Sequence, residues 1–270
     1  MRAERATSTG TRPLRSGRLK GKVAIVTGAG SRGPGLGNGK AAAILFAREG
    51  AQVLCVDRVI ERAEETCAMI LSEDGEASPL QADVSRSSDC ERMISAVSER
   101  YGRLDILHNN VGIESRKGLL ETSEAEWDQV LAVDLKSMFL AAQAAIPRLV
   151  EAGGGSIINV SSVAALRAHG RTAYAAAKAG VIGLTISLAG QLAKDRIRVN
   201  CIAPGFVYTP MVAEGMSAEL RERRRLAAPI QDEGTAWDVA WAAVYLASDE
   251  SRWVTGQVLA VDGGLTITSR

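Results

Sequence analysis

Short runs rich in valine, isoleucine and leucine alternate along the chain with longer segments of mixed polarity. Seven of these runs have the length and composition of β-strands: residues 22–28, 51–57, 77–83, 103–110, 155–162, 197–205 and 256–264. They lack strict apolar–polar alternation, which indicates strands buried on both faces. Segments 39–50, 59–75 and 88–102 repeat apolar residues in steps of three and four, as amphipathic helices do. The pattern predicts an α/β fold: a doubly wound parallel sheet of about seven strands with helices on both faces.

No internal repeat or low-complexity linker interrupts the chain after residue 20. We therefore expect a single Rossmann-type domain over residues 20–270. The preceding segment is basic and polar and lacks the apolar stretch of a secretory signal, so residues 1–19 are predicted to be a disordered arm. An organelle transit peptide is the alternative, which Glu4 disfavours. We identify no apolar run of membrane-spanning length, and therefore expect no membrane partner.

Composition excludes several classes of function. The chain has 32 Lys and Arg against 31 Asp and Glu, a formal net charge of +1, so no strong field favours nucleic acid or an acidic membrane. Its cysteines, Cys55, Cys67, Cys90 and Cys201, lie far apart and have no histidine partner at metal-ligand spacing. They are expected to be reduced core residues of a cytoplasmic protein, and no metal site is predicted.

The connection between the first predicted strand and helix, TGAGSRGPGLGNG, is rich in glycine. Bare backbone before a helix lets a pyrophosphate approach free N–H groups and the positive end of the helix dipole. Gly28, Gly37 and Gly39 can occupy these positions. The second strand ends in Asp57, whose carboxylate can accept hydrogen bonds from a ribose and would repel a 2′-phosphate. The pattern predicts a dinucleotide site that prefers NAD to NADP. The adjacent Arg58 weakens this argument, because its guanidinium could turn toward the 2′-phosphate of NADP.

A second constellation lies between residues 161 and 178. Tyr174 and Lys178 are four residues apart in an alanine-rich helical segment, so they share one helix face. A lysine ammonium beside a phenol stabilises the phenolate, which makes the tyrosine a usable acid and base near neutral pH. Ser161 and Ser162 end a predicted strand, where a hydroxyl can reach a substrate oxygen. The set points to proton transfer at an oxygen of the substrate.

Together these motifs resemble the short-chain dehydrogenase/reductase family, in its short soluble branch, over about residues 20–265. The matching segments are TGAG…GNG, ADV, NNVG, INVSS, YAAAK, RVNCIAPGFVYTPM and WVTGQVLAVDGG. The resemblance implies that Tyr174 is the general acid and base. It also implies that Lys178 binds the ribose hydroxyls and assists the tyrosine, and that Ser162 orients the substrate carbonyl or alcohol.

The resemblance implies a set of cofactor contacts as well. Besides Gly28, Gly37, Gly39, Asp57, Arg58, Tyr174 and Lys178, the set contains Ser31, Asn38, Asp83, Val84, Asn110, Val111, Gly112, Pro204, Gly205, Val207 and Thr209. Asp83 and Val84 would lie beside the adenine. The backbone around Val207 and the Thr209 hydroxyl would hold the nicotinamide carboxamide.

Two spacings depart from the family pattern. Eight residues separate Gly28 from Gly37 where the family commonly has three, so SRGPG (31–35) is interpreted as an insertion. It either covers the phosphates or loops into solvent. The serine also lies closer to the tyrosine than usual. Strand register favours Ser162 as the catalytic serine, whereas simple counting favours Ser161.

A third departure concerns the active-site asparagine of the family, whose position is occupied by Asp134. We retain Asp134 as a catalytic candidate, because the family residue acts largely through its main-chain carbonyl. Its carboxylate either raises the pKa of Lys178 or is sequestered by hydrogen bonds.

Several residues outside these motifs are candidates for substrate contact. The predicted substrate contacts are Ser162, His169, Tyr208 and Met211. His169 lies in the loop between the serine and Tyr174, which borders the substrate in this family. Tyr208 and Met211 lie near the segment that is expected to cover the substrate. His108 falls within a predicted strand and is expected to be a packed core residue. A cluster of arginines is expected to be a solvated helix face, with attraction of an anionic substrate as the alternative: Arg221, Arg223, Arg224 and Arg225.

The predicted reaction is reversible hydride transfer between NAD and a small-molecule substrate, a secondary alcohol or ketone. One alternative is a dinucleotide-binding regulator with weakened catalysis, which Asp134 keeps open. The other is a nucleotide-sugar epimerase or dehydratase, which the short segment after VDGG disfavours. The resemblance implies a homotetramer packed through helices around residues 123–150 and 171–194 and through the C-terminal strand region.

Overall fold

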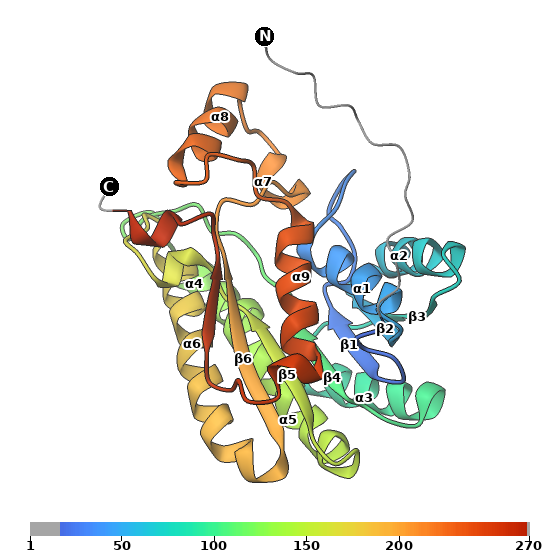
Figure 1. Cartoon of the computed structure of the whole chain (residues 1–270). Coiled ribbons are helices and arrows are strands. Elements are labelled where there is room, and N and C mark those ends of the chain that lie inside the picture. Colours follow the sequence, from blue (N-terminus) through green and yellow to red (C-terminus); the bar gives the residue numbers. More distant parts are fainter. Residues whose placement is uncertain (1–16, 269–270) are drawn as a thin grey trace.

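Seven strands form one sheet in the order β3-β2-β1-β4-β5-β6-β7. The computed structural model describes residues 17–268, and Figure 1 shows the sheet between layers of helices. The strands are β1 (Val23–Thr27), β2 (Gln52–Asp57), β3 (Glu76–Gln81), β4 (Ile106–Asn109), β5 (Gly155–Val160), β6 (Ile197–Pro204) and β7 (Val258–Val261). Every pairing is parallel. The predicted doubly wound parallel sheet is confirmed.

The helices divide into those that cover the two faces of the sheet and shorter ones in the connections that follow β4 and β6. The covering helices are α1 (Asn38–Arg48), α2 (Ile60–Ser72), α3 (Ser87–Tyr101), α5 (Ser137–Glu151), α6 (Thr172–Leu192) and α9 (Ala236–Ala247). The others are α4 (Glu124–Leu131), α7 (Pro210–Ala213) and α8 (Ala218–Ala227). A π-helical turn, η1 (Ala132–Lys136), joins α4 to α5, and short 3₁₀ turns are η2 (Val163–Ala165), η3 (Ala193–Asp195), η4 (Asp249–Ser251) and η5 (Leu265–Ile267).

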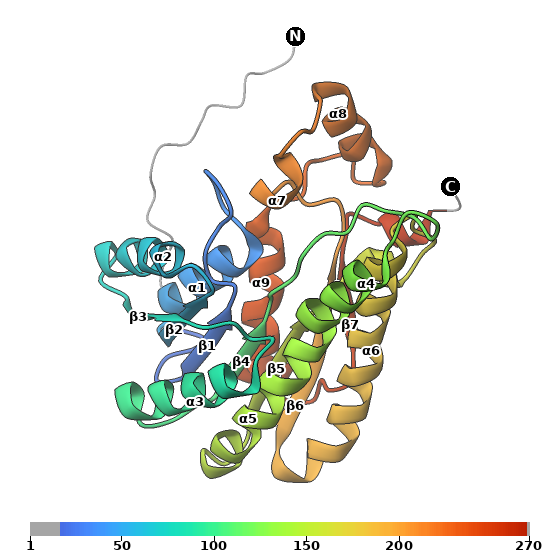
Figure 2. The same cartoon turned by 180° about the vertical axis from the view of Figure 1, so that it is seen from behind.

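Alternate side chains of the inner strands enter two separate apolar cores. In β1, Ala24 and Val26 pack with residues of α1, α2 and α9, whereas Val23 and Ile25 pack with residues of α3, α5 and α6. Figures 1 and 2 show these two helix layers on opposite faces of the sheet. Because both faces are covered by apolar side chains, the inner strands carry no polar alternation.

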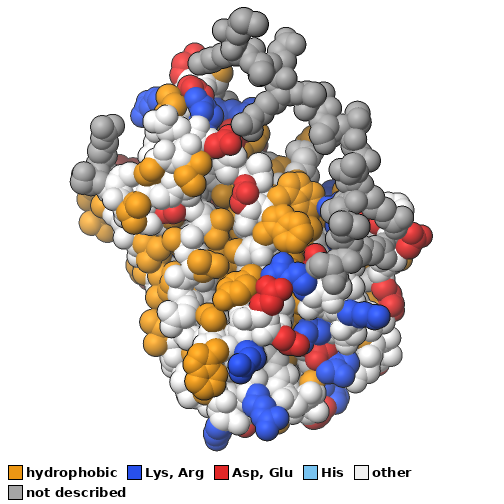
Figure 3. Space-filling view, viewed as in Figure 1, with side chains coloured by type: hydrophobic (Ala, Val, Ile, Leu, Met, Phe, Trp, Pro, Cys, Tyr) orange, Lys and Arg blue, Asp and Glu red, His pale blue; other side chains and the backbone are white. Residues whose placement is uncertain are grey.

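The edge strands depart from the expected burial on both faces. β3 is half-buried or exposed along its length and contains Pro79, whose missing N–H is tolerated at a sheet edge. β7 is also partly exposed. Figure 3 shows hydrophobic side chains gathered on the face that carries β7 and α9. The expectation therefore holds for the inner strands and fails at the edges, where one neighbour is absent.

Two helical stretches correct the expectation that no apolar run reaches membrane-spanning length. Residues Glu124–Glu151 and Thr172–Asp195 are long enough, and each contains an 18-residue window with a mean hydropathy of 1.4 and 1.3, respectively. Both are nevertheless packed against the domain: α5 contributes Ala141 and Ala145 to the core, and α6 contributes Ala189. They are core helices. Close packing against the sheet requires small side chains, and the alanines that meet this requirement also raise the mean hydropathy.

The predicted N-terminal arm, residues 1–19, lies outside the described residues except for its last three positions. Within these, Leu19 is fully buried and its N–H donates to the carbonyl of Glu49 at 2.9 Å. The packed part of the chain thus begins slightly before residue 20.

The strand register brings the carboxyl ends of the central strands to one level. Thr27 at the end of β1 pairs with Asn109 of β4, and Asn109 pairs with Asn159 of β5. The Asn109 side chain donates to Asn159 Oδ1 at 2.9 Å, which ties the two strand ends together. The loops that follow these strands therefore open into the same crevice, where ligands bind in open α/β sheets.

Candidate active site

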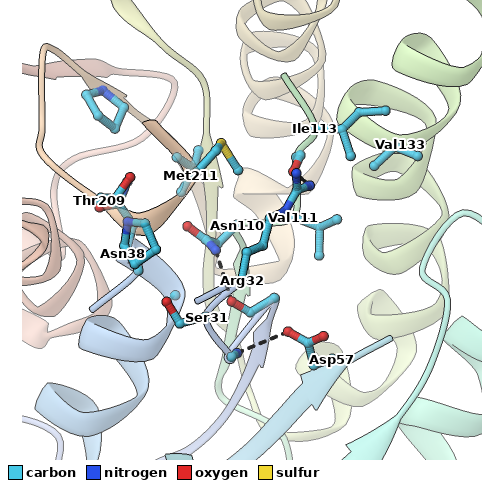
Figure 4. Close-up of a pocket in the computed structure, with 18 of the residues that line it drawn as sticks. Ser31, Arg32, Asn38, Asp57, Asn110, Val111, Ile113, Val133, Thr209 and Met211 are labelled. Atoms are coloured by element: carbon cyan, nitrogen blue, oxygen red, sulfur yellow. Dashed lines mark hydrogen bonds between the residues drawn. The ribbon is translucent and has the colours of Figure 1, made fainter. Parts of the chain in front are cut away.

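A cavity of about 490 Å³ opens beyond the carboxyl ends of the strands. This size is typical of cofactor and small-molecule sites. The cavity wall combines the glycine loop, the ends of β2 and β4, part of α6 and the loop after β6. Figure 4 shows Arg32, Asn38 and Asp57 around this space, with Met211 opposite Ile113 and Val133.

All the residues predicted to contact the cofactor line this one cavity. They are Gly28, Ser31, Gly37, Asn38, Gly39, Asp57, Arg58, Asp83, Val84, Asn110, Val111, Gly112, Tyr174, Lys178, Pro204, Gly205, Val207 and Thr209. They come from loops far apart in the sequence, and the strand order brings them together.

The glycine loop lies close to the sheet because it lacks side chains. A Cβ on Gly39 would lie 2.1 Å from the Gly28 carbonyl oxygen and 2.5 Å from Asn110 Nδ2. Asn110 Nδ2 in turn donates to the Gly28 carbonyl at 3.2 Å. Gly37 is the N-cap of α1, so the helix begins, with its unpaired N–H groups, at the cavity wall. This arrangement fits a bound pyrophosphate.

Two buried polar atoms of the same loop support this fit. Ser31 Oγ and Asn38 Oδ1 have no hydrogen-bond partner within residues 17–268, and both residues line the cavity. Buried polar groups are nearly always hydrogen-bonded. Their position therefore suits a ligand rich in hydroxyls and phosphate oxygens, and the residues present fit a dinucleotide.

Asp57 is held in place at the end of β2 by backbone donors. The Gly30 N–H donates to Oδ2 at 3.1 Å and the Val59 N–H donates to Oδ1 at 3.0 Å. Arg58 and Arg62 line the cavity beside it. Arg62 was not among the predicted contacts, because its only sequence signal is a place in the first turn of the helix after Asp57.

The inserted segment is divided between the cavity and the exterior. Ser31 and Arg32 line the cavity, whereas Gly33, Pro34 and Gly35 do not. The Arg32 guanidinium donates from Nη2 to the carbonyl of Gly112 at 3.0 Å. Figure 4 shows its side chain extending from the loop toward Val111 and Ile113. Arg32 was missed from sequence, because an insertion gives no alignment to predict where its side chains lie.

The ammonium group of Lys178 is buried and surrounded by negative or dipolar groups. It donates to the Val160 carbonyl at 3.1 Å, lies 3.4 Å from Asp134 Oδ2 and lies 5.7 Å from the Tyr174 ring centroid. Burial disfavours the ammonium, but the charges of Asp134 and Tyr174 outweigh this effect, so the pKa of Lys178 is raised. A positive charge is thereby maintained beside the phenol.

Asp134 lies behind Lys178 and is not part of the cavity wall. It is fully buried in the π-helical turn η1, a feature common at functional sites, and its Oδ1 accepts the Ile113 N–H at 2.8 Å. Burial raises the pKa of Asp134, and the charges of Lys178 and Arg32 and the Ile113 N–H oppose that effect. Only Oδ1 has a hydrogen-bond partner among the described residues, whereas Oδ2 has none and lies near the Lys178 ammonium. The geometry therefore favours the first alternative, in which Asp134 raises the pKa of Lys178.

The two serines after β5 make different contacts. Ser161 is buried, and its Oγ donates to the Lys178 carbonyl at 2.7 Å. Ser162 is half-buried, and its Oγ accepts the Ala164 N–H at 3.2 Å. Both line the cavity, but only the Ser162 hydroxyl hydrogen is uncommitted. The geometry favours Ser162 as the serine that meets a substrate.

The predicted substrate residues are not all brought together. Ser162 and Met211 line the cavity, whereas His169 and Tyr208 do not. Tyr208 packs beneath the Arg221 guanidinium at 3.8 Å from its ring centroid. Residues that sequence reasoning missed also line the cavity: Gly30, Arg32, Arg62, Ile113, Gln129, Val133, Pro210 and Val212. Arg224, which the sequence favoured as part of a solvated helix face, lines it as well. They lie on helix faces and loops whose directions depend on packing.

His108 is a packed core residue, as expected. It is fully buried with its ring 5.8 Å from that of Phe46, and burial lowers its pKa to about 4. The four cysteines are buried as well.

Comparison with known proteins identifies the family. A family model described as enoyl-(acyl carrier protein) reductase matches residues 35–266. A crystal structure of a short-chain dehydrogenase/reductase from Burkholderia xenovorans has a TM-score of 0.90 and 40% identity, covering 94% of this chain and 100% of that chain. The chain belongs to the short-chain dehydrogenase/reductase family.

Two further relatives indicate the chemistry found among related reductases. The 3-oxoacyl-[acyl-carrier-protein] reductase FabG of Thermotoga maritima is 41% identical over 251 residues, which are 93% of this chain and 100% of that protein. A 7α-hydroxysteroid dehydrogenase in complex with NADH and 7-oxo glycochenodeoxycholic acid has a TM-score of 0.86 and 33% identity, covering 92% of this chain and 95% of that chain. This short-chain dehydrogenase/reductase is therefore an oxidoreductase with a nucleotide-binding fold of the Rossmann type.

Replacing Gly39 with alanine should weaken NADH binding. The added Cβ would lie 2.1 Å from the Gly28 carbonyl oxygen, so the loop must shift away from α1. An overpacking cost of about 1–3 kcal/mol corresponds to roughly a 5- to 150-fold rise in Kd, measured by fluorescence titration. Gly33→Ala is the matched control, because its Cβ would meet no atom within 4 Å. Equal Kd values for the two variants would contradict this reading of the loop.

Replacing Asp134 with asparagine should alter the pH dependence of turnover. The change removes the charge that raises the pKa of Lys178 and keeps an oxygen for the Ile113 N–H. Lys178 would then lose its proton at lower pH, so the alkaline limb of the kcat/KM profile should move to lower pH. Asp128→Asn, at an exposed position of α4, is the control. An alkaline limb that does not move would exclude the electrostatic role of Asp134.

Proposed function

We propose that this short-chain dehydrogenase/reductase catalyses reversible hydride transfer between NAD and a secondary alcohol or ketone. The observation that carries the proposal is that Tyr174, Lys178 and Ser162 line the same cavity as the glycine loop. An acid–base pair and a hydroxyl donor are thus placed in one cavity with residues that fit a dinucleotide.

The side chains act on the substrate oxygen and its proton. When bound, NAD accepts or supplies the hydride. In the oxidative direction the Tyr174 phenolate takes the proton of the substrate hydroxyl. Ser162 donates a hydrogen bond to the same oxygen as it becomes a carbonyl. The Lys178 ammonium, compensated by Asp134, keeps positive charge beside the phenolate throughout.

The proposed preference for NAD over NADP rests on Asp57. Its carboxylate lines the cavity at the end of β2, where a 2′-phosphate would be repelled. Arg58 and Arg62 line the same region, and they favour a phosphate. The hydrogen bonds from Gly30 and Val59 keep the Asp57 carboxylate in place and support the preference for NAD.

We further propose that residues 20–270 act as a single domain in a cytoplasmic homotetramer. Exposed apolar side chains on α5, α6, α9 and β7 support this assembly: Phe139, Ile186, Trp241 and Leu259. Burying them between subunits would remove apolar surface from water. Sedimentation equilibrium should give the mass of four chains, and a monomer mass at micromolar concentration would contradict this.

The second candidate is a dinucleotide-binding regulator with weakened catalysis. The observation that favours it is the carboxylate of Asp134 at 3.4 Å from the Lys178 ammonium, in place of the neutral amide of the family. The experiment below separates the two candidates.

Tyr174→Phe should abolish nearly all turnover while leaving NADH binding intact. The phenylalanine keeps the ring and removes the only atom that exchanges the substrate proton, so a loss on the order of 100-fold or more in kcat is expected. Turnover is measured as NADH appearance over a panel of aliphatic and cyclic secondary alcohols, with NADP in parallel, and NADH binding by fluorescence.

Tyr245→Phe, on α9 outside the cavity wall, is the matched control and should retain activity. A fully active Tyr174→Phe enzyme would exclude the proposed mechanism. NADH binding without turnover of any alcohol or ketone by the unaltered protein would favour the regulator. A higher kcat/KM with NADP than with NAD would overturn the cofactor preference alone.

A further inference from the structure

The arginines of α8 are not equivalent. Arg221 pairs with Glu233 at 2.5 Å, and Arg225 pairs with Glu222 at 2.7 Å. These two guanidinium groups therefore have carboxylate partners. The sequence expectation of a solvated helix face holds for this part of the helix.

Arg224 differs from its neighbours in its surroundings. It is half-buried, lines the cavity that also contains Ser162 and Tyr174, and places its guanidinium carbon 4.4 Å from the centroid of the Phe206 ring. No carboxylate within residues 17–268 forms an ion pair with it. A partly desolvated guanidinium without a counter-ion is costly unless a ligand supplies one.

The charges around Arg224 increase its need for an anion. Arg116 and Arg171 share a single carboxylate, Glu114, which lies 2.7 Å from Arg116 Nε and is also paired with Arg171 Nη1. Arg116, Arg171 and Glu114 together therefore keep a net positive charge. Burial, and then the positive charges of Arg171 and Arg116, lower the pKa of Arg224. The charge of Glu233 opposes this effect, but Glu233 is already paired with Arg221. This end of the cavity is electropositive although the whole chain is nearly neutral.

His169 adds a neutral polar group close to this region. Its Nδ1 is buried without a hydrogen-bond partner in the described part of the chain. Burial lowers its pKa, and the charges of Arg167 and Arg224 lower it further, so the ring stays neutral near pH 7. A neutral imidazole does not supply the missing negative charge.

The cavity wall that Arg224 shares with the catalytic residues includes several apolar side chains. Ile113, Val133, Met211 and Val212 line the cavity, and Figure 4 shows Met211 facing Ile113 and Val133 across it. A substrate that fits this space has an apolar segment between its reacting carbon and a group that meets the guanidinium. The planar fork of arginine matches the oxygens of carboxylates and phosphates.

We propose that Arg224 is a specificity-determining residue that binds an oxyanion, a carboxylate or phosphate ester, at the distal end of an aliphatic oxo or hydroxy substrate. This rests on the proposed function for the reacting end of that substrate. The anion neutralises Arg224 in the cavity, and α8 brings the guanidinium to it.

The first test compares acids with their neutral counterparts. Aliphatic oxo acids of increasing chain length are each paired with their methyl esters, and hydroxyketone phosphates with the unphosphorylated ketones. The unaltered protein should prefer the anion of one of these series. In Arg224→Gln the ratio of kcat/KM for anion over neutral partner should fall roughly 10- to 100-fold, as expected for loss of a charged hydrogen bond. Arg224→Lys should retain part of the preference.

Arg223→Gln is the matched control, because it makes the same change of charge at an exposed position of the same helix. Its anion-to-neutral ratio should equal that of the unaltered protein. A ratio that is unchanged in Arg224→Gln, or that falls equally in Arg223→Gln, would overturn the proposal. An increase in the KM for NAD alone would assign Arg224 to the cofactor and would likewise overturn it.

A binding measurement separates this proposal from the proposed reaction. Calorimetry on the NADH-saturated protein uses butanoate and methyl phosphate, which cannot be reduced. Binding to the unaltered protein that is lost in Arg224→Gln supports the anion site even if no ketone is turned over, in which case only the proposed reaction fails. Absence of binding to the unaltered protein, or equal binding by both proteins, would exclude the anion site even if neutral ketones are reduced.

Discussion

The buried ammonium group of Lys178 is the constraint on which the arrangement of the site depends. A desolvated charge must be compensated, and its partners come from separate elements: the Val160 carbonyl from β5, the Asp134 carboxylate from η1 and the Tyr174 ring from α6. Asp134 is in turn fixed by the Ile113 N–H, beyond the end of β4. Compensating one charge thus joins two strand ends and two helices at the place where proton transfer is proposed.

The absence of side chains is as important as their presence at this place. A Cβ on Gly112 would lie 3.2 Å from Lys178 Nζ and 3.3 Å from Asp134 Oδ2, and the Arg32 guanidinium reaches the Gly112 carbonyl. The charge of Arg32 opposes the rise in the pKa of Asp134. Two departures from the family pattern, the insertion and the aspartate, are therefore electrostatically connected. The charge of Arg32, from the inserted loop, helps to compensate the carboxylate of Asp134, which stands where the family has a neutral asparagine side chain.

The two ends of the cavity use charge differently. At the reacting end, Lys178 has a buried carboxylate partner 3.4 Å away. At the α8 end, Arg224 packs on Phe206 and has no such partner in the described residues, while Glu114 is shared by two other arginines. Fixed compensation suits a group that stays charged through a reaction cycle. An uncompensated cation suits a position where the ligand brings the missing charge.

The α/β class, the inner strands and the glycine loop of the cavity could be predicted from the sequence alone, because these features are local. Other residues of the cavity wall, such as Arg32 and Arg62, carry no such local pattern. A strand buried on both faces requires a continuous apolar run, and a glycine loop before a helix is visible as such. The burial of the edge strands, the different contacts of Ser161 and Ser162, and the separation of Arg224 from Arg221 and Arg225 were decided only by the tertiary structure. These depend on which way a side chain points and what lies opposite it. Neighbours in sequence on one helix or strand end then meet different surroundings, and no local pattern records that difference.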